Sequence, residues 1–161
     1  MDRIDRRTFC LGLGAAGLLI AAGLPLPASA TRRAAGFTMW HSPGCGCCLE
    51  WQARVEALFG RRMEVREIAD MAALKSANGV PQDLWSCHTA RIGSVVVEGH
   101  VPPADIRRLI DTRGAAWAGL AVPGMPLGSP GMDVGHNRRE PYDVIAFGGG
   151  RRTVWARHGQ S

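Results

Sequence analysis

The chain lacks several features that would place it in a familiar class of protein. It has no oxygen-rich metal-binding motif, no internal repeat and no low-complexity tract. Its 19 Lys and Arg residues outnumber 14 acidic ones and give a net charge of +5, but they occur as scattered pairs, without a block of basic and aromatic residues. Scattered pairs are typical of a solvated surface, so we predict no nucleic-acid partner.

What the chain does contain is clustered sulfur. Three thiols lie within four residues in Cys45-Gly46-Cys47-Cys48, and a fourth, Cys87, lies in Ser86-Cys87-His88-Thr89. A hydrophobic core does not require such spacing. Crowded thiols are typical of proteins that bind a soft metal or exchange disulfides.

Residues 1–30 are predicted to be an export signal of the twin-arginine type. Arg6-Arg7 precedes an apolar stretch that ends near Ala28-Ser29-Ala30, a small-residue cleavage site. The alternative is an uncleaved membrane anchor, but the stretch is interrupted by glycines and is short for a span of ~20 residues. We therefore expect residues 31–161 to form one exported domain with no stable membrane insertion. In the oxidising compartment that an exported chain enters, free thiols persist only if they are occupied or continually reduced.

Apolar periodicity and turn residues predict an α/β domain. Helical faces are expected at Trp51, Val55, Leu58 and Phe59, and at Ile106, Leu109 and Ile110. The predicted elements are a strand at 37–41, a helix from Cys48 to Gly60, a strand at 63–66, a helix at 70–77, a hairpin at 88–98, a helix from Pro103 and a terminal hairpin at 142–156. This order is that of a single thioredoxin-like domain.

Two further expectations follow from this layout. The cysteine turn lies at the amino end of the first helix, where free N–H groups and the helix dipole stabilise thiolate over thiol. The stretch from Ala115 to Gly135 is rich in Gly, Pro and Met and shows no clear period. Such a long loop is usually functional, and its prolines make it stiff, so we predict a fixed cover over the cysteine turn.

The cysteine turn supports more than one chemistry. Cys45 and Cys48 form a C-x-x-C pair, which suits reversible disulfide exchange at a helix start. The extra thiol of Cys47 offers competing exchange partners, which is a liability for that role but an advantage for holding a soft cation. A plain structural disulfide is the remaining alternative.

Other soft donors follow along the chain. Cys87 and His88 by themselves would be ordinary core residues, but the fold brings the hairpin start beside the first helix turn, which makes both candidate ligands. His100 is a candidate ligand or outer-shell group. Met125 and Met132 are flanked by Gly and Pro and are not part of an apolar stripe, which favours a fixed role for their thioethers. His41 borders the turn, while His136 and His158 are expected at the surface.

Three metals are compatible with these donors. Zinc would accept Cys45, Cys48, Cys87 and His88 as a closed site, but that leaves Cys47 and the methionines unexplained. Iron–sulfur clusters also use cysteines, although methionine would be an unusual addition. Copper accounts for the most residues, because thiolates and thioethers suit Cu(I), and adjacent thiolates could bridge more than one ion.

The motifs together resemble one bacterial family. They are CGCC at 45–48 followed by Trp51, SCHT at 86–89, VEGHVP at 97–102 and VPGMPLGSPGMD at 122–133. In this order they resemble the CopG-like copper-resistance proteins, a metal-binding family with a domain of unknown function, over residues 37–147. The family commonly has Glu where this chain has Asp133.

The resemblance implies a thioredoxin-like fold, periplasmic export and copper binding, with Cu(I)/Cu(II) interconversion as a proposed role. By position it implies that Cys45, Cys47, Cys48 and Cys87 are sulfur ligands. His88, His100, Met125 and Met132 are then expected nearby.

We predict a periplasmic copper-binding protein of copper tolerance, whose partners are copper ions and other periplasmic copper-handling or redox proteins. The alternatives are a thioredoxin-type thiol–disulfide oxidoreductase, with Cys45 and Cys48 as its redox pair, and a structural zinc domain. We leave enzymatic activity on copper or thiols open.

Overall fold

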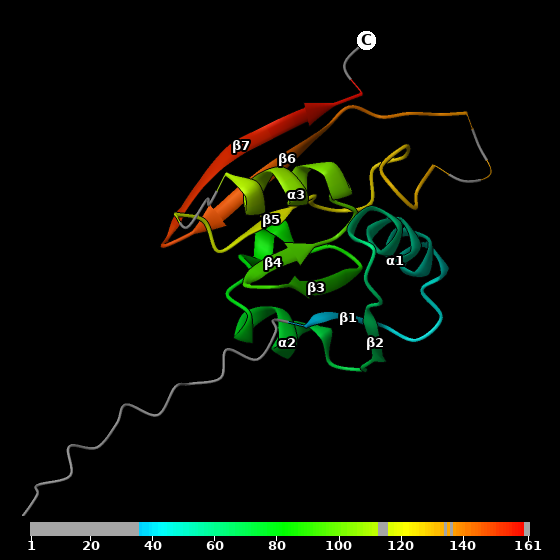
Figure 1. Cartoon of the computed structure of the whole chain (residues 1–161), viewed down its shortest axis with the longest axis horizontal. Helices are drawn as coiled ribbons and strands as arrows, with labels where there is room; N and C mark the ends of the chain where they lie inside the picture. The colour runs from blue at the N-terminus through cyan, green and yellow to red at the C-terminus, as the bar shows by residue number, and fades with distance from the viewer. Residues whose placement is uncertain (1–35, 113–115, 134, 136, 160–161) are drawn as a thin grey trace, which may run out of the picture. The chain divides into compact units, whose positions relative to one another are not determined.

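The computed structural model describes residues 36–112, 116–133, 135 and 137–159, so the predicted export signal and His136 lie outside the described residues. The elements in chain order are β1 (Phe37–His41), α1 (Gly46–Phe59), β2 (Glu64–Glu67), α2 (Met71–Ala77), the 3-10 helix η1 (Gln82–Leu84), β3 (His88–Ile92), β4 (Val95–Glu98), α3 (Pro103–Asp111), β5 (Gly119–Ala121), β6 (Tyr142–Gly148) and β7 (Arg151–His158) (Figure 1). Among the described residues, no helix combines the length and apolar character that crossing a membrane requires.

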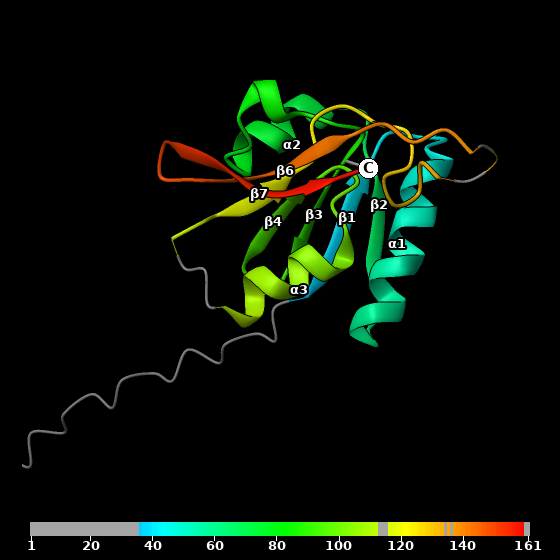
Figure 2. The ribbon, with the colours of Figure 1, turned by 90° about the horizontal axis from the view of Figure 1, so that it is seen from above.

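The described strands form one seven-stranded sheet in the order β2-β1-β3-β4-β5-β6-β7. β2 is parallel to β1, whereas β3 is antiparallel to both β1 and β4. α1 and α3 lie on one face of these four strands and α2 lies on the other (Figure 2). The α/β thioredoxin-like prediction is confirmed. β5 pairs parallel to β4, and the predicted terminal hairpin, β6 and β7, extends the sheet.

Local sequence signals set the helix ends. The Asp70 side chain accepts a hydrogen bond from the backbone N–H of Ala73 and caps α2. Pro103 opens α3, where its missing N–H costs nothing. Gly60 ends α1 with φ of 63°, a left-handed conformation that glycine adopts without steric penalty. These three signals were predicted from the sequence.

Each face of the sheet has its own apolar core. The larger core joins Met39, Trp51, Val97, Ile106 and Leu109, all fully or almost fully buried, between the sheet and the helices α1 and α3. The smaller core, on the face that α2 covers, contains Val80, Leu84, Val96, Ala121 and Phe147.

Two residues predicted to face inward do not. Leu58 is 46% exposed and Ile110 is 38% exposed. Both lie in the last turn of their helix, and Ile110 lines a cavity of about 420 Å³ together with Phe59 and Arg107. Periodicity gives the direction of an apolar face, but it does not say where along the helix that face ceases to be covered.

The stretch from 115 to 135, predicted without regular structure, contains β5. All three β5 residues are buried, so the strand lacks the alternation that marks a half-exposed strand. Gly119 permits the close pairing with β4, because a methyl group there would lie 2.1 Å from the Val96 carbonyl oxygen. The short helix η1 was also missed.

Candidate metal centre

The sheet topology brings the four thiols of the described chain to one end of the sheet. Cys45 is the N-cap of α1, and Cys47 and Cys48 lie in its first turn. Cys87 immediately precedes β3. Because β1 and β3 are antiparallel and His41 pairs with His88, the turn that follows β1 lies beside the segment that precedes β3.

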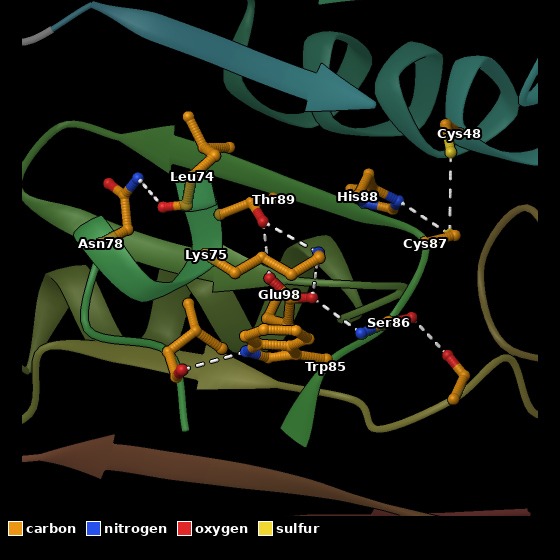
Figure 3. Close-up of polar contacts among 12 residues, drawn as sticks. Cys48, Leu74, Lys75, Asn78, Trp85, Ser86, Cys87, His88, Thr89 and Glu98 are labelled. Atoms are coloured by element: carbon orange, nitrogen blue, oxygen red, sulfur yellow. Dashed lines mark hydrogen bonds and ion pairs between the residues drawn. The ribbon is translucent and has the colours of Figure 1, made fainter. Parts of the chain in front are cut away.

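The sulfur atoms converge. The Sγ atoms of Cys48 and Cys87 are 3.6 Å apart (Figure 3), and those of Cys45 and Cys47 are 3.5 Å apart. All four Sγ atoms lie within 4.8 Å of one another. Residues 39 positions apart thus meet in a single cluster, which we call the sulfur cluster (Cys45, Cys47, Cys48 and Cys87).

The C-x-x-C pair is oxidised in this structure. Cys45 and Cys48 form a disulfide, while Cys47 and Cys87 are free thiols. A metal site that uses all four sulfurs as thiolates therefore requires reduction of this disulfide by two electrons.

Two imidazoles face the sulfur of Cys87. Its Sγ lies 3.0 Å from Nε2 of His100 and 3.3 Å from Nδ1 of His88. His100 donates from Nδ1 to the Pro130 carbonyl oxygen at 2.8 Å, which leaves Nε2 with its lone pair toward the sulfur. Metal-binding histidines are commonly oriented by such a bond from the second nitrogen.

His88 is completely buried, and no described residue forms a hydrogen bond with its Nε2. Its ring packs against Trp51, with ring centroids 4.5 Å apart, and meets the His100 ring edge-on. An unpaired buried polar atom costs about 1–3 kcal/mol. The other ring nitrogen, Nδ1, already has the Cys87 sulfur as its partner.

Burial is the largest influence on the pKa values of Cys87, His88 and His100. It raises the pKa of the Cys87 thiol to about 12, with a further contribution from the nearby Cys47. Burial, followed by the neighbouring His100, holds the pKa of His88 well below its usual value, and burial also lowers that of His100. The thiolate-stabilising environment predicted for the turn therefore does not extend to Cys87. A bound metal would have to displace its proton, while both imidazoles are neutral and have lone pairs available.

The loop before β6 lies against the first turn of α1. Pro130 orients His100, and a methyl group at Gly131 would come within 2.6 Å of the Cys47 carbonyl oxygen. Arg54 on α1 donates two hydrogen bonds, of 2.6 and 2.7 Å, to the two carboxylate oxygens of Asp133. This bidentate pair anchors the loop to α1. In the sequence, Met132 stands between Gly131 and Asp133, the two residues that contact α1. Met125 is 51% exposed. It follows Gly124, whose carbonyl oxygen accepts a hydrogen bond from the Ser86 hydroxyl.

Replacing Gly131 with alanine is expected to destabilise the protein more than the same change at Gly124. Both glycines have positive φ, which costs alanine about 1–2 kcal/mol, but only Gly131 has no space for a methyl group. The overlap with Cys47 should add roughly 1–3 kcal/mol. Urea unfolding of both variants measures the difference, and equal losses would contradict the close contact.

Two supporting features were not predicted. The buried Lys75 ammonium lies 2.5 Å from a carboxylate oxygen of Glu98, and this oxygen also accepts the Ser86 N–H next to Cys87 (Figure 3). The sequence predicts only that Lys75 lies in the helix at 70–77. No local pattern in a sequence indicates that a lysine is buried. His158 was expected at the surface, but it binds Asp105 at 2.7 Å and stacks on Tyr142.

The fold and the clustered donors define an α/β thioredoxin-like protein with a group of cysteines and histidines that could hold a metal. The chain belongs to the CopG-like family of copper resistance proteins. Two solved structures of copper resistance protein CopG, Form 1 and Form 2, are each 42% identical to it, with TM-scores of 0.70 and 0.69. They cover 76% of this chain, which in turn covers 96% and 97% of theirs.

A family model described as protein of unknown function, DUF411, matches residues 84–132. This segment includes Cys87, His88, His100 and both candidate methionines. No curated protein matches the chain. The family resemblance seen in the sequence is confirmed.

Proposed function

We propose that this protein is a periplasmic copper-binding protein of copper tolerance that holds Cu(I) on the sulfur cluster when the Cys45–Cys48 disulfide is reduced. The observation that carries the proposal is the approach of all four Sγ atoms to within 4.8 Å. Membership of a family of copper resistance proteins supports copper as the metal.

The donor set favours Cu(I) over zinc. Thiolates are soft ligands that select Cu(I), and a closed zinc site needs only four donors. Here the four sulfurs lie within 4.8 Å of one another, and Cys87 also lies within 4.8 Å of one nitrogen of His88 and one of His100. The surplus of donors, with Cys47 and Cys48 adjacent in sequence, would allow sulfur atoms to bridge more than one ion.

We further propose that the protein cycles copper between Cu(I) and Cu(II). The disulfide and dithiol forms of Cys45 and Cys48 differ by two electrons. Each copper ion exchanges one electron when it changes between Cu(I) and Cu(II). Two Cu(II) ions can therefore accept the two electrons that the thiolates release as the S–S bond forms, and the reverse reaction reduces the disulfide. Met125 and Met132 would supply thioethers to Cu(I).

The proposal includes export. Residues 1–30 would direct the chain to the periplasm and be removed, without stable membrane insertion. Other periplasmic copper-handling or redox proteins would exchange copper or electrons with the site.

Anaerobic titration of the reduced chain with Cu(I), followed by X-ray absorption at the copper edge, tests this function. We expect more than one copper per chain, coordination dominated by sulfur, and short copper–copper contacts. Coordination by nitrogen and oxygen only, or the absence of copper binding, would refute the proposal.

A second candidate function is thiol–disulfide exchange. The Cys45–Cys48 disulfide at the amino end of α1 favours it, because that is the position of a reactive pair in this fold. The two functions differ in their dependence on Cys87, because copper binding requires this sulfur and disulfide exchange between Cys45 and Cys48 does not.

A further inference from the structure

We propose that a cavity at the ends of α1 and α3 binds a small anionic amphiphile, a molecule free in solution with an apolar chain and a carboxylate head. This cavity, which we call the end cavity, has a volume of about 420 Å³. The residues that matter for its chemistry are Phe37, Phe59, Arg61, Ile92, Arg107 and Ile110. No candidate metal ligand lines it, so the proposal goes beyond the copper function and does not depend on it.

The topology separates the end cavity from the sulfur cluster. β1 begins at Phe37, which pairs with Ile92, the last residue of β3. α1 begins at the sulfur cluster and ends at Phe59 beside the end cavity, and its 14 residues make it about 21 Å long. α1 and α3 lie on the same face of the sheet (Figure 2), and both end at this cavity. The molecule therefore has two distinct sites, one at each end of α1.

The walls of the end cavity are apolar. Ile92 is fully buried, and Phe37, which is 8% exposed, meets the ring of Phe59 edge-on with centroids 5.3 Å apart. Ile110 is 38% exposed, although its position in the apolar period of α3 predicts that it faces inward. An apolar chain that covers these side chains would remove them from water, which is favourable. The cavity volume is also within the roughly 300–1,000 Å³ that small-molecule sites occupy.

Two arginines make the end cavity positive. The guanidinium carbon of Arg61 lies 4.9 Å from the Phe37 ring centroid, and that of Arg107 lies 4.3 Å from the Phe59 centroid. Asp111 also lines the cavity, but it forms no ion pair with either arginine. Two cationic groups against one carboxylate favour an anionic ligand over a neutral or cationic one.

Arg107 offers a buried donor to such a ligand. Its Nη2 donates to the Leu58 carbonyl oxygen at 3.1 Å, one of the carbonyls that the end of α1 leaves without a helical partner. That bond accounts for one nitrogen. Nε is buried, and no described residue accepts its hydrogen. A buried N–H without an acceptor is costly, and a carboxylate bound in the cavity would supply the acceptor in a geometry that suits a guanidinium.

Calorimetric titration of the full chain with octanoate, below its micelle concentration, tests the proposal. We expect one octanoate per chain. Octan-1-ol has the same chain length without the charge and should bind at least about 10-fold more weakly, because it lacks a charge-assisted hydrogen bond. Absence of octanoate binding would overturn the proposal, and so would equal affinity for the two molecules.

Variants of the lining residues locate the ligand. Arg107→Met keeps an unbranched side chain beside Phe59 but removes the donors, so the affinity for octanoate should fall close to that for octan-1-ol. Arg61→Met, at an exposed position, should also weaken octanoate binding and leave octan-1-ol binding unchanged. Ile110→Trp should fill the cavity and abolish binding of both molecules.

Arg151→Met is the matched control. The guanidinium carbon of Arg151 lies 5.2 Å from the Trp117 ring centroid, a similar stacking contact outside the end cavity. This variant should bind octanoate as the unmodified chain does. Circular dichroism checks that every variant is folded. Equal octanoate affinity in the folded Arg61→Met and Arg151→Met variants would show that the arginines of the cavity do not recognise the carboxylate.

Two other occupants of the end cavity are distinguishable by experiment. Co-sedimentation with vesicles of phosphatidylcholine and phosphatidylglycerol tests a membrane surface, and sedimentation equilibrium tests a second copy of the chain. Vesicle binding without octanoate binding would replace the proposal with membrane docking. A dimer that Ile110→Trp dissociates, again without octanoate binding, would replace it with self-association. Octanoate binding with the expected pattern of variants supports the proposal in either experiment.

Discussion

Replacing Cys87 with serine is expected to reduce the affinity of the reduced protein for Cu(I) by more than the 10- to 100-fold that loss of an outer-shell partner typically costs. The Cys87 sulfur touches the rest of the sulfur cluster through Cys48, at 3.6 Å, and touches both imidazoles. Its removal takes away the atom that joins these two groups of donors. The copper-to-protein ratio should fall as well. Competition with a Cu(I) chelator of known affinity measures both quantities.

The same variant separates the two candidate functions. A thiol–disulfide oxidoreductase depends on Cys45 and Cys48 and should be indifferent to Cys87, so Cys87→Ser would retain disulfide exchange activity. A copper-binding protein should lose affinity with either Cys87→Ser or Cys48→Ser. Met125→Leu serves as a milder comparison, because this side chain is half exposed and should contribute less than a thiolate. Unchanged copper affinity in Cys87→Ser would contradict the copper proposal.

Replacing Lys75 with alanine is expected to lower the free energy of unfolding by about 3–5 kcal/mol, because it leaves the carboxylate of Glu98 buried without its cation. Both side chains are almost fully buried, with 4% and 0% exposure, and Thr89 completes the network by donating to Glu98. Such a loss is a large part of the stability of a small domain. Urea unfolding monitored by circular dichroism measures it.

Two comparisons make this prediction specific. The double variant Lys75→Met/Glu98→Leu should recover part of the loss, since apolar replacement of a buried pair is often neutral or better. The recovery should be incomplete, because Glu98→Leu also removes the acceptor of the Ser86 N–H and of the Thr89 hydroxyl. Arg66→Ala removes an ion pair of similar length, 2.7 Å to Glu64, but both side chains are 56% exposed. It should cost less than about 1 kcal/mol. Equal effects of Lys75→Ala and Arg66→Ala would show that burial does not control the strength of the Lys75 pair.

Copper affinity should also respond to Lys75→Ala, although less than to loss of a ligand. A Glu98 oxygen accepts the Ser86 N–H at 2.7 Å and thereby holds the backbone immediately before Cys87. The network thus links stability on the α2 face of the sheet to the position of a sulfur at its end.

Short-range signals explain why the order of elements was predictable. The Asp70 cap, Pro103 and Gly60 act within one helical turn, and the apolar period of α1 is visible in consecutive residues. The same local logic failed at β5, where Gly119-Leu120-Ala121 is buried throughout and has no period to detect. It failed again at Leu58 and Ile110, because exposure at a helix end depends on what lies opposite.

The candidate site was predictable in its chemistry but not in its geometry. Clustered cysteines and the Gly/Pro-flanked methionines already indicated soft-metal chemistry, because that property belongs to the side chains themselves. The disulfide between Cys45 and Cys48 and the raised pKa of Cys87 were not determined in this way. The disulfide joins residues only three positions apart and was one of the alternatives that the sequence left open. The raised pKa of Cys87 depends on burial that arises only when separate segments come together.

The sequence by itself determined the family, the order of all strands and helices except η1 and β5, and the preference for sulfur and imidazole donors, since these depend on residue types and their near neighbours. Only the tertiary structure decided that Cys87 lies 3.6 Å from Cys48, that two particular ring nitrogens face its sulfur, and that Lys75 is buried against Glu98. The antiparallel register of β1 and β3 and the packing of α2 on the opposite face set those distances, and a register is a property of paired strands that no single segment carries.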